Sequence, residues 1–216
     1  MRISIVCTDR HHPIFVELER WCASRARMHE LVLSHTFEGL IGGDILFLIS
    51  CSIIVTPEIR GKYRHCLLVH ASNLPEGRGW SPLIWQILEG RCNVAVTLLE
   101  ASDPVDSGAI WAKRWLNLTG DELHDEINEK LFAIELELMD FAMANYNKIE
   151  PQVQSETGAS WYRRRNPEDS RINPHKPLAE QFDLLRVADP ERYPAFFELR
   201  GEYYAISIRK MRNADK

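Results

Sequence analysis

Short apolar runs alternate with stretches of helical periodicity along most of the chain. The runs are bounded by turn residues, as β-strands are, and lie at Arg2–Cys7, Glu30–His35, Asp44–Cys51, Cys66–Val69, Val94–Leu99 and Ile110–Leu118. Helical spacing predicts helices at Pro13–Ser24, Ser81–Glu89 and Pro177–Val187, with a short helical turn at Pro57–Tyr63. The run from Asp44 is apolar on both faces, which is typical of a central parallel strand. This alternation predicts an α/β fold with a Rossmann-like, doubly wound and mostly parallel sheet.

A long amphipathic helix separates this part of the chain from the rest. We expect Thr119 or Asp121 to cap the helix. Its apolar stripe is expected to pack in the core and consists of Leu123, Ile127, Leu131, Ile134, Leu138 and Phe141. The polar segment Glu150–Ser160 indicates a linker, and Arg200-Gly201 indicates the turn of a final hairpin. The chain is therefore expected to divide into a core of residues 1–150 and a small α+β extension of residues 151–216.

The composition is that of a soluble globular protein. The chain has 216 residues, of which 45% are hydrophobic and 26% are charged. Its net charge of −5 argues against general nucleic-acid binding. The N-terminus begins as a strand rather than a signal peptide, and no apolar run reaches the roughly 20 residues that span a bilayer. We therefore expect neither a nucleic-acid nor a membrane partner.

The five cysteines lie at positions 7, 22, 51, 66 and 92. They are odd in number and have no C-x-x-C spacing, which predicts neither a disulfide framework nor a zinc site. Cys7 and Cys51 fall in apolar strand-like runs, where a cysteine behaves as a small hydrophobe. The pattern favours a reducing cytoplasm, and nothing in the sequence implies a metal.

Candidate chemistry gathers at the ends of two predicted strands. His70 ends the apolar run Leu67-Leu68-Val69, and the loop that follows it is rich in Ser, Asn, Pro and Gly. Asp106 lies on a second loop, after the run that ends at Leu99. Alone, His70 would more often be a structural histidine, and Asp106 also suits a turn. Together, in an open α/β sheet whose ligands bind at strand ends, they favour an acid–base pair.

These residues belong to a recognisable pattern. His70-x-Ser72-x-Leu74-Pro75, Arg78-Gly79, Ser81-Pro82 and Asp106-x-Gly108 resemble the formyltransferase family that uses 10-formyltetrahydrofolate. The resemblance implies that His70 and Asp106 are catalytic and that 10-formyltetrahydrofolate is the co-substrate, with no metal. It implies folate contacts from Ser50, Cys51, Arg78, Gly79, Trp80, Leu99, Asp103 and Val105.

One position departs from the family pattern. The family usually has an Asn two residues before the catalytic His, where it helps to hold the formyl oxygen, and this chain has Leu68 there. A leucine side chain cannot donate a hydrogen bond. The donor is therefore expected to be His70 itself, a loop amide or Asn73, which we count with the catalytic residues.

The second half of the chain indicates the acceptor. The segment from Tyr162 to Ile172 resembles formyltransferases that act on nucleotide-linked 4-amino sugars. The length and the loop after His70 are most similar to enzymes of pseudaminic-acid-type pathways, which serve flagellin or surface-polysaccharide glycosylation. The resemblance implies a UDP-linked 4-amino-4,6-dideoxy sugar held by Tyr162, Arg163, Arg164, Arg165, Arg171, Phe197 and Tyr203. Guanidinium groups suit diphosphate oxygens.

Two other functions are also compatible with the sequence. A glycinamide-ribonucleotide-type formyltransferase would share the chemistry without needing the long tail after residue 150. A non-catalytic folate or nucleotide-sugar binding protein would account for Leu68. A methionyl-tRNA formyltransferase is disfavoured because the chain leaves no room for that enzyme's C-terminal β-barrel. The closing aromatic segment suits either a homodimer surface or a wall of the substrate site.

Overall fold

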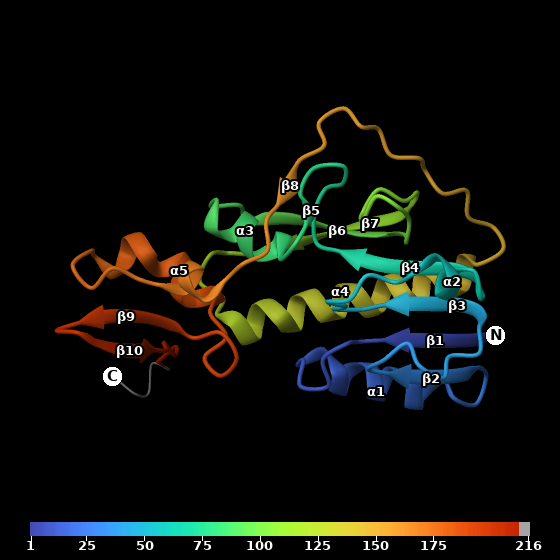
Figure 1. The fold of residues 1–216 in the computed structure, drawn as a ribbon, viewed down its shortest axis with the longest axis horizontal. Coiled ribbons are helices and arrows are strands. Elements are labelled where there is room, and N and C mark those ends of the chain that lie inside the picture. The colour runs from blue at the N-terminus through green and yellow to red at the C-terminus, as the bar shows by residue number, and fades with distance from the viewer. Residues whose placement is uncertain (212–216) are drawn as a thin grey trace.

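A six-stranded sheet organises the fold (Figure 1). The computed structural model describes residues 1–211. The sheet order is β2-β1-β3-β4-β6-β7, and its strands are β1 Arg2–Val6, β2 Glu30–Ser34, β3 Gly43–Leu48, β4 Tyr63–His70, β6 Asn93–Glu100 and β7 Ile110–Asn117. The first four strands are mutually parallel, and β6 is antiparallel to both of its neighbours. The predicted mostly parallel α/β sheet is therefore confirmed.

Three helices cover one face of this sheet. They are α1 Ile14–Arg25, α3 Pro82–Leu88 and α4 His124–Asn145. Their apolar side chains, such as Leu18, Ile87 and Leu138, pack on inward-facing strand residues such as Phe47 and Leu98 in one core cluster. Burying this apolar surface is the main stabilising contribution to such a layer.

Loops and the one-turn helix α2 Pro57–Arg60 cover the opposite face. There Val6, Leu46 and Leu48 of the strands pack against Leu40 and Val55 of the connecting segments. The strand β2 lies on one side of β1, and β3 lies on the other side. The order in which strands are added to the sheet therefore reverses at β1. The carboxyl ends of parallel strands beside such a reversal are where open sheets bind ligands. Because only loops and a short helix cover this face, polar loop segments can line the carboxyl edge of the sheet.

Two predicted helix boundaries are wrong. Helix α4 begins at His124 and has no side-chain cap from Thr119 or Asp121; instead Glu126 accepts a hydrogen bond from the Leu123 amide at 2.8 Å. The residues before it fold into a turn, because the buried Glu122 carboxylate accepts the Thr119 amide at 2.9 Å. The helix predicted at Pro177–Val187 is a 3₁₀ turn, Leu178–Gln181, followed by α5 Phe182–Val187.

The C-terminal part has a small apolar cluster of its own. Strand β8 Trp161–Tyr162 pairs with β5 Arg78–Gly79, and a second 3₁₀ turn follows at Pro167–Ser170. The predicted hairpin is present as β9 Ala195–Leu199 and β10 Glu202–Ile206. Ile172, Leu185 and Ala195 form its buried cluster. In Figure 1 the hairpin projects beyond the carboxyl edge of the sheet. No helix in residues 1–211 is long and apolar enough to cross a membrane.

Candidate functional site

His70 stands at the carboxyl end of β4 and is 7% exposed. Its Nε2 lies 2.8 Å from the Gly77 carbonyl oxygen, and its Nδ1 lies 3.7 Å from Oδ1 of Asp106. A carbonyl can only accept a hydrogen bond, so the Nε2 atom carries the proton in the neutral ring. Nδ1 is then the ring nitrogen with a free lone pair, and it faces the Asp106 carboxylate. The structure therefore places His70 and Asp106 next to each other, as the sequence predicted.

Asp106 is held in place from two directions. It is 4% exposed and lies in the loop between β6 and β7 with φ of 59°, a left-handed conformation that Asp tolerates better than most residues. Its Oδ2 accepts the Gly79 amide at 2.9 Å. Its own carbonyl accepts a hydrogen bond from Gln154 at 2.9 Å. One carboxylate oxygen thus anchors the loop, and the other faces His70.

The loop after His70 is fixed by side chains from three neighbouring elements. Gln86 of α3 donates to the Ala71 carbonyl at 2.7 Å, and Thr97 of β6 donates to the Ser72 carbonyl at 2.7 Å. Lys113 of β7 donates to the Leu74 carbonyl at 2.8 Å. The Asn73 side chain itself is exposed. These contacts set the direction of the loop backbone before any ligand binds.

Leu68 lies in an apolar environment. It sits opposite Leu99 on the antiparallel neighbour β6 and packs against the cluster of Leu74, Leu99 and Ile110. An Asn there would place a polar amide among aliphatic side chains, at a cost of about 1–3 kcal/mol unless it found a partner. The local packing explains why leucine suits this position. Because Leu68 cannot donate a hydrogen bond, any donor to the formyl oxygen of a substrate must come from another residue of the site.

Arg78 is tied into the protein rather than exposed at the site. Its side chain is 2% exposed, and its guanidinium donates to Glu156 and to Gln154, each at 3.1 Å. Gly79 has φ of 97°, and a Cβ there would lie 2.4 Å from the Tyr162 carbonyl oxygen. The contribution of both residues is to shape the loop. Trp80 is half-buried, with the Arg164 guanidinium 4.8 Å from its ring centroid.

The other expected folate contacts lie in two segments along the same edge. Ser50 and Cys51 follow β3, where Ser50 has φ of 51° and the Cys51 thiol donates to the Val6 carbonyl at 3.0 Å. Burial raises the pKa of the Cys51 thiol to about 12, which keeps it from acting as a nucleophile. Leu99 is fully buried, so only its backbone is available to a ligand.

Asp103 and Val105 belong to the second segment, the loop that carries Asp106. Asp103 is exposed and forms an ion pair with Arg60 of α2, while Val105 is half-buried. This ion pair lowers the pKa of Asp103. Because α2 packs on the face of β3 and β4, the pair fastens the Asp106 loop to the loop cover of the sheet.

The expected sugar-nucleotide residues form two separate groups. In the first, Tyr162 stacks on Trp85, and Arg163 lies over the Trp85 ring while pairing with Asp169. Arg165 is half-buried and donates to the Asp169 carbonyl at 2.9 Å. This group packs on α3, beside the loop that follows His70.

The second group lies in the hairpin. Arg171 pairs with Glu198 at 2.7 Å and lies over the Phe196 and Tyr203 rings. Phe197 stacks on Tyr204, and Tyr203 is 66% exposed. The structure therefore brings Arg171 and Tyr203 together on one face of the hairpin and places Phe197 on the other face, against the small C-terminal cluster. None of the three contacts the α3 group.

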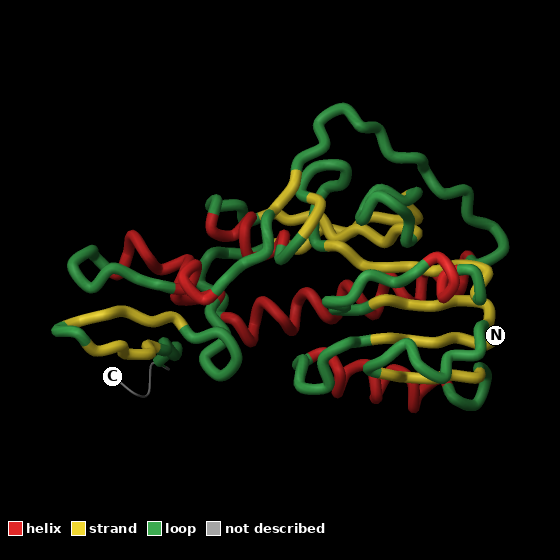
Figure 2. The backbone as a smooth tube through the Cα atoms, viewed as in Figure 1, coloured by secondary structure: helices red, strands yellow, loops and turns green. Residues whose placement is uncertain are grey.

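The segment expected to be a linker is packed against the site. Figures 1 and 2 show the connection from α4 to β8 as a loop that arches past the sheet. Gln152 pairs with Ile110, Gln154 donates to the carbonyls of Asp106 and Gly108, and Ser160 accepts the Gly77 amide at 2.9 Å. The segment is largely exposed, as its polar composition predicts for a linker, but these contacts anchor it to the site. The alternate spacing of Gln152, Gln154 and Glu156 was the available signal.

Sequence reasoning also missed Lys113, Ile53 and Ile54. The two isoleucines are 57% and 62% exposed in the loop after β3, directly beyond Ser50 and Cys51. Two adjacent exposed isoleucines at a strand end were a readable signal. Lys113 had none, because its relation to the loop depends on strand pairing.

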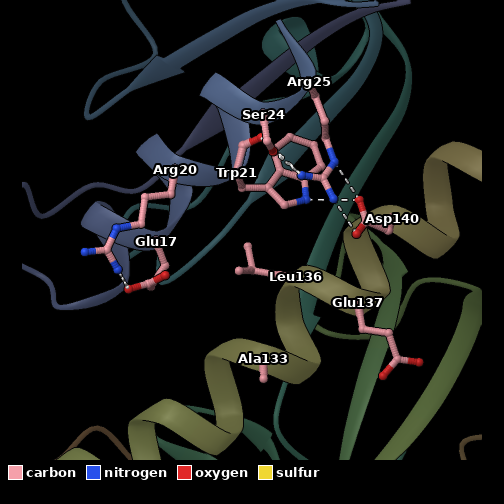
Figure 3. A pocket seen from close by; sticks show the side chains of 9 residues that line it. All are labelled: Glu17, Arg20, Trp21, Ser24, Arg25, Ala133, Leu136, Glu137 and Asp140. Carbon is pink, nitrogen blue, oxygen red and sulfur yellow. Dashed lines mark hydrogen bonds and ion pairs between the residues drawn. The ribbon is translucent and has the colours of Figure 1, made fainter.

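A groove elsewhere on the molecule does not belong to this site. Figure 3 shows it between α1 and α4, where Trp21 and Arg25 of α1 both donate to Asp140 of α4. It therefore lies among the helices that cover the face of the sheet opposite Leu68. Among residues 1–211, no group of three or more His, Cys, Asp or Glu side chains is arranged to hold a metal ion.

Comparison with known sequences points to one family. The sequence model of the family described as Formyl transferase matches residues 12–142. The methionyl-tRNA formyltransferase of Rickettsia massiliae (strain Mtu5) is 28% identical over 177 residues, which are 81% of this chain and 58% of that protein. The chain thus spans little more than half the length of that relative.

Solved structures share the fold. A methionyl-tRNA formyltransferase from Clostridium thermocellum has a TM-score of 0.84 at 26% identity, over 99% of this chain and 95% of that one. A sugar N-formyltransferase from a Shewanella species has a TM-score of 0.73 at 16% identity, over 96% and 97% of the two chains. HypX from Aquifex aeolicus in complex with tetrahydrofolic acid has a TM-score of 0.76 at 20% identity, over 96% of this chain and 37% of that one. The family match contains both His70 and Asp106, and the chain belongs to the formyl transferase family.

Proposed function

We propose that this protein moves a formyl group from 10-formyltetrahydrofolate to the amine of a nucleotide-linked 4-amino-4,6-dideoxy sugar, with UDP as the nucleotide. The observation that carries formyl transfer is the buried His70–Asp106 pair at the carboxyl edge of the sheet, inside the family match. We place the reaction in the cytoplasm and its product in flagellin or surface-glycan synthesis. The glycan that receives it follows from the sequence resemblance alone.

The residues of this edge fit a folate. Because β3 and β4 are parallel neighbours, the Ile53-Ile54 loop and His70 follow strand ends on the same edge. Exposed isoleucines offer an apolar surface for a flat aromatic ring system. The backbone of the 101–108 loop, held by Arg60 and Asp103, supplies polar groups for its edge. When bound there, 10-formyltetrahydrofolate supplies the formyl group.

His70 and Asp106 carry the proton transfers. An amine must be neutral to attack a carbonyl carbon, and it must lose a proton as the new C–N bond forms. Nδ1 of His70 takes that proton, while Gly77 holds the ring through Nε2. Asp106 stabilises the protonated ring from 3.7 Å, and the same imidazole can return a proton to the leaving nitrogen.

Asn73 is the proposed donor to the formyl oxygen in place of Leu68. A donor fixed where charge develops contributes about 10²–10³ in rate to related acyl-transfer sites. Asn73 lies three residues after His70 in the loop that the neighbouring strands hold in place.

The α3 group is the proposed contact for the diphosphate. Arg164 is exposed, and its guanidinium lies over Trp80, which follows the Gly79 amide that Asp106 binds. Arg163 and Arg165 are already engaged with Asp169, so Arg164 is the stronger phosphate candidate. The sugar N-formyltransferase from Shewanella, with the same fold over nearly its whole chain, supports an acceptor of this class. The exposed hairpin aromatics are the candidate surface for a homodimer.

A second acceptor is favoured by the relatives. Both the Rickettsia relative and the Clostridium structure are methionyl-tRNA formyltransferases, and the latter aligns over 95% of its chain. The chain covers 95% of the Clostridium structure but 58% of the Rickettsia protein, so its length does not decide between the two acceptors. The net charge of −5 still favours a small nucleotide over a tRNA.

Parallel assays separate the two acceptors. The protein is incubated with 10-formyltetrahydrofolate and either a UDP-4-amino-4,6-dideoxy sugar or methionyl-tRNA, and each product is analysed by mass spectrometry. We expect a formyl adduct on the sugar amine, lost with Arg164→Ala at subsaturating sugar and retained with Arg10→Ala, an exposed arginine at the β1–α1 turn. Formylation of methionyl-tRNA alone would contradict the proposed acceptor.

A further inference from the structure

Three residues on neighbouring strands form a row on the loop-covered face of the sheet. His70 of β4 pairs directly with Thr97 of β6, and Thr97 pairs directly with Lys113 of β7. Directly paired residues of antiparallel strands point to the same face. Lys113 therefore shares a face with His70, two strands away from it. The row thus connects His70, the proposed base, with the side-chain ammonium group of Lys113, which has no role in the proposed reaction.

The Lys113 ammonium is committed to the loop after His70. It donates to the Asn73 side-chain oxygen at 2.7 Å and to the Leu74 carbonyl at 2.8 Å. Both acceptors are neutral oxygens. Burial lowers the pKa of Lys113, and no carboxylate within residues 1–211 offsets that effect. A partly buried cation held only by neutral acceptors gains no ion-pair stabilisation, so its contacts need an explanation beyond stability.

The contact with Asn73 determines which end of its amide is free. A primary amide has one acceptor oxygen and one donor nitrogen. With the oxygen bound to Lys113, the nitrogen must point the other way, and its two hydrogens remain available. The ammonium also polarises the amide, which strengthens the N–H groups as donors.

We propose that Lys113 is a positioning residue that orients Asn73, so that the Asn73 amide nitrogen donates to the formyl oxygen where Leu68 cannot. This inference rests on the proposed formyl transfer, although not on the identity of the acceptor. Lys113 acts through Asn73 and does not itself touch the reacting atoms. A structural brace for Leu74 alone is the competing account.

A double-mutant cycle separates these accounts. The variants are Lys113→Met, which keeps an unbranched side chain without the charge, Asn73→Ala, and the two combined. Lys148→Met, in the exposed turn after α4, is the control. Removing the Asn73 donor should lower kcat by about 10²-fold. Lys113→Met should lower it by ~10-fold or more, as losing an orienting partner does. The double variant should resemble Asn73→Ala, with KM little changed in all of them.

Two further measurements make the cycle independent of the acceptor. Hydrolysis of 10-formyltetrahydrofolate by water, which yields formate and tetrahydrofolate, requires the same oxygen donor and no amine. The side-chain amide signals of Asn73 in ¹⁵N NMR spectra need no turnover. We expect Lys113→Met to shift those signals, and Lys148→Met to leave them in place.

The outcomes decide the proposal. Additive losses in the cycle, a change in KM alone, or unchanged Asn73 amide signals in Lys113→Met would each overturn it. Asn73→Asp offers a further check, because a carboxylate keeps the Lys113 contact but cannot donate, and it should be as slow as Asn73→Ala. If the wild-type protein formylates no sugar, the proposed acceptor fails, while hydrolysis and NMR still test Lys113.

Discussion

Glu135 is a carboxyl group that the fold buries without a partner. It lies on the sheet-facing side of α4 and is 6% exposed, and its Oε2 has no hydrogen-bond partner among residues 1–211. Burial raises its pKa from 4.5 to about 8. The folded protein therefore holds Glu135 protonated at neutral pH, while the unfolded chain ionises it near its ordinary pKa.

The pKa difference determines how stability depends on pH. Below pH 4.5 both states are protonated, and Glu135 adds nothing to the pH dependence of stability. Between pH 4.5 and about 8 only the unfolded state releases the proton, so stability falls as pH rises. At ~1.4 kcal/mol for each pH unit, the loss reaches ~5 kcal/mol by pH 8, which is an upper bound. This is a large share of the ~5–15 kcal/mol that stabilises a typical domain.

Glu135→Gln removes the titration while keeping the shape of the side chain. We expect the variant to match the wild-type protein near pH 5 and to exceed its free energy of unfolding by a few kcal/mol near pH 8. Urea denaturation followed by circular dichroism from pH 5 to pH 9 measures this difference. Glu129→Gln, an exposed site on the same helix, is the control. A difference between wild type and Glu135→Gln that stays constant with pH would refute the reasoning.

Three other substitutions test the site. Asp106→Asn should fold normally and lower kcat by about 10²–10⁴, because an amide no longer stabilises protonated His70; an unchanged rate in steady-state assays would exclude the pairing. Gly79→Ala should lower the midpoint of thermal unfolding, because its Cβ would lie 2.4 Å from the Tyr162 carbonyl oxygen. Gly90→Ala has open space around its Cβ and should lower that midpoint less. Leu68→Asn should destabilise the protein by about 1–3 kcal/mol in urea, and a variant as stable as wild type would show that the pocket around Leu68 is polar.

The positions of His70 and Asp106 at strand ends could be predicted from the residues around them. His70 ends an apolar run before a turn-rich loop, and Asp106 sits in a turn after another run, so both could be placed at strand ends. Their meeting required only the order of neighbouring strands. The family resemblance rested on the same residues, and the family match agrees with it.

Residues whose roles depend on long-range packing could not be predicted. Arg78 looked like an open loop residue, but Glu156 and Gln154, far along the chain, bury its guanidinium. Lys113 acquires its contact with Asn73 only through the pairing of β6 with β7. The separation of Arg171 from Arg163 follows from the path of the extension, which periodicity does not determine.

Transfer of a labelled formyl group tests the central claim most directly. The protein is mixed with 10-[¹³C]formyltetrahydrofolate and a UDP-4-amino-4,6-dideoxy sugar, and the label is followed by NMR in the wild-type protein and in His70→Ala. The account predicts a labelled formamide on the sugar amine, formed about 10²–10⁴ times more slowly by His70→Ala. A wild-type rate that is unchanged in His70→Ala, or a bound folate whose label never leaves it, would contradict the account.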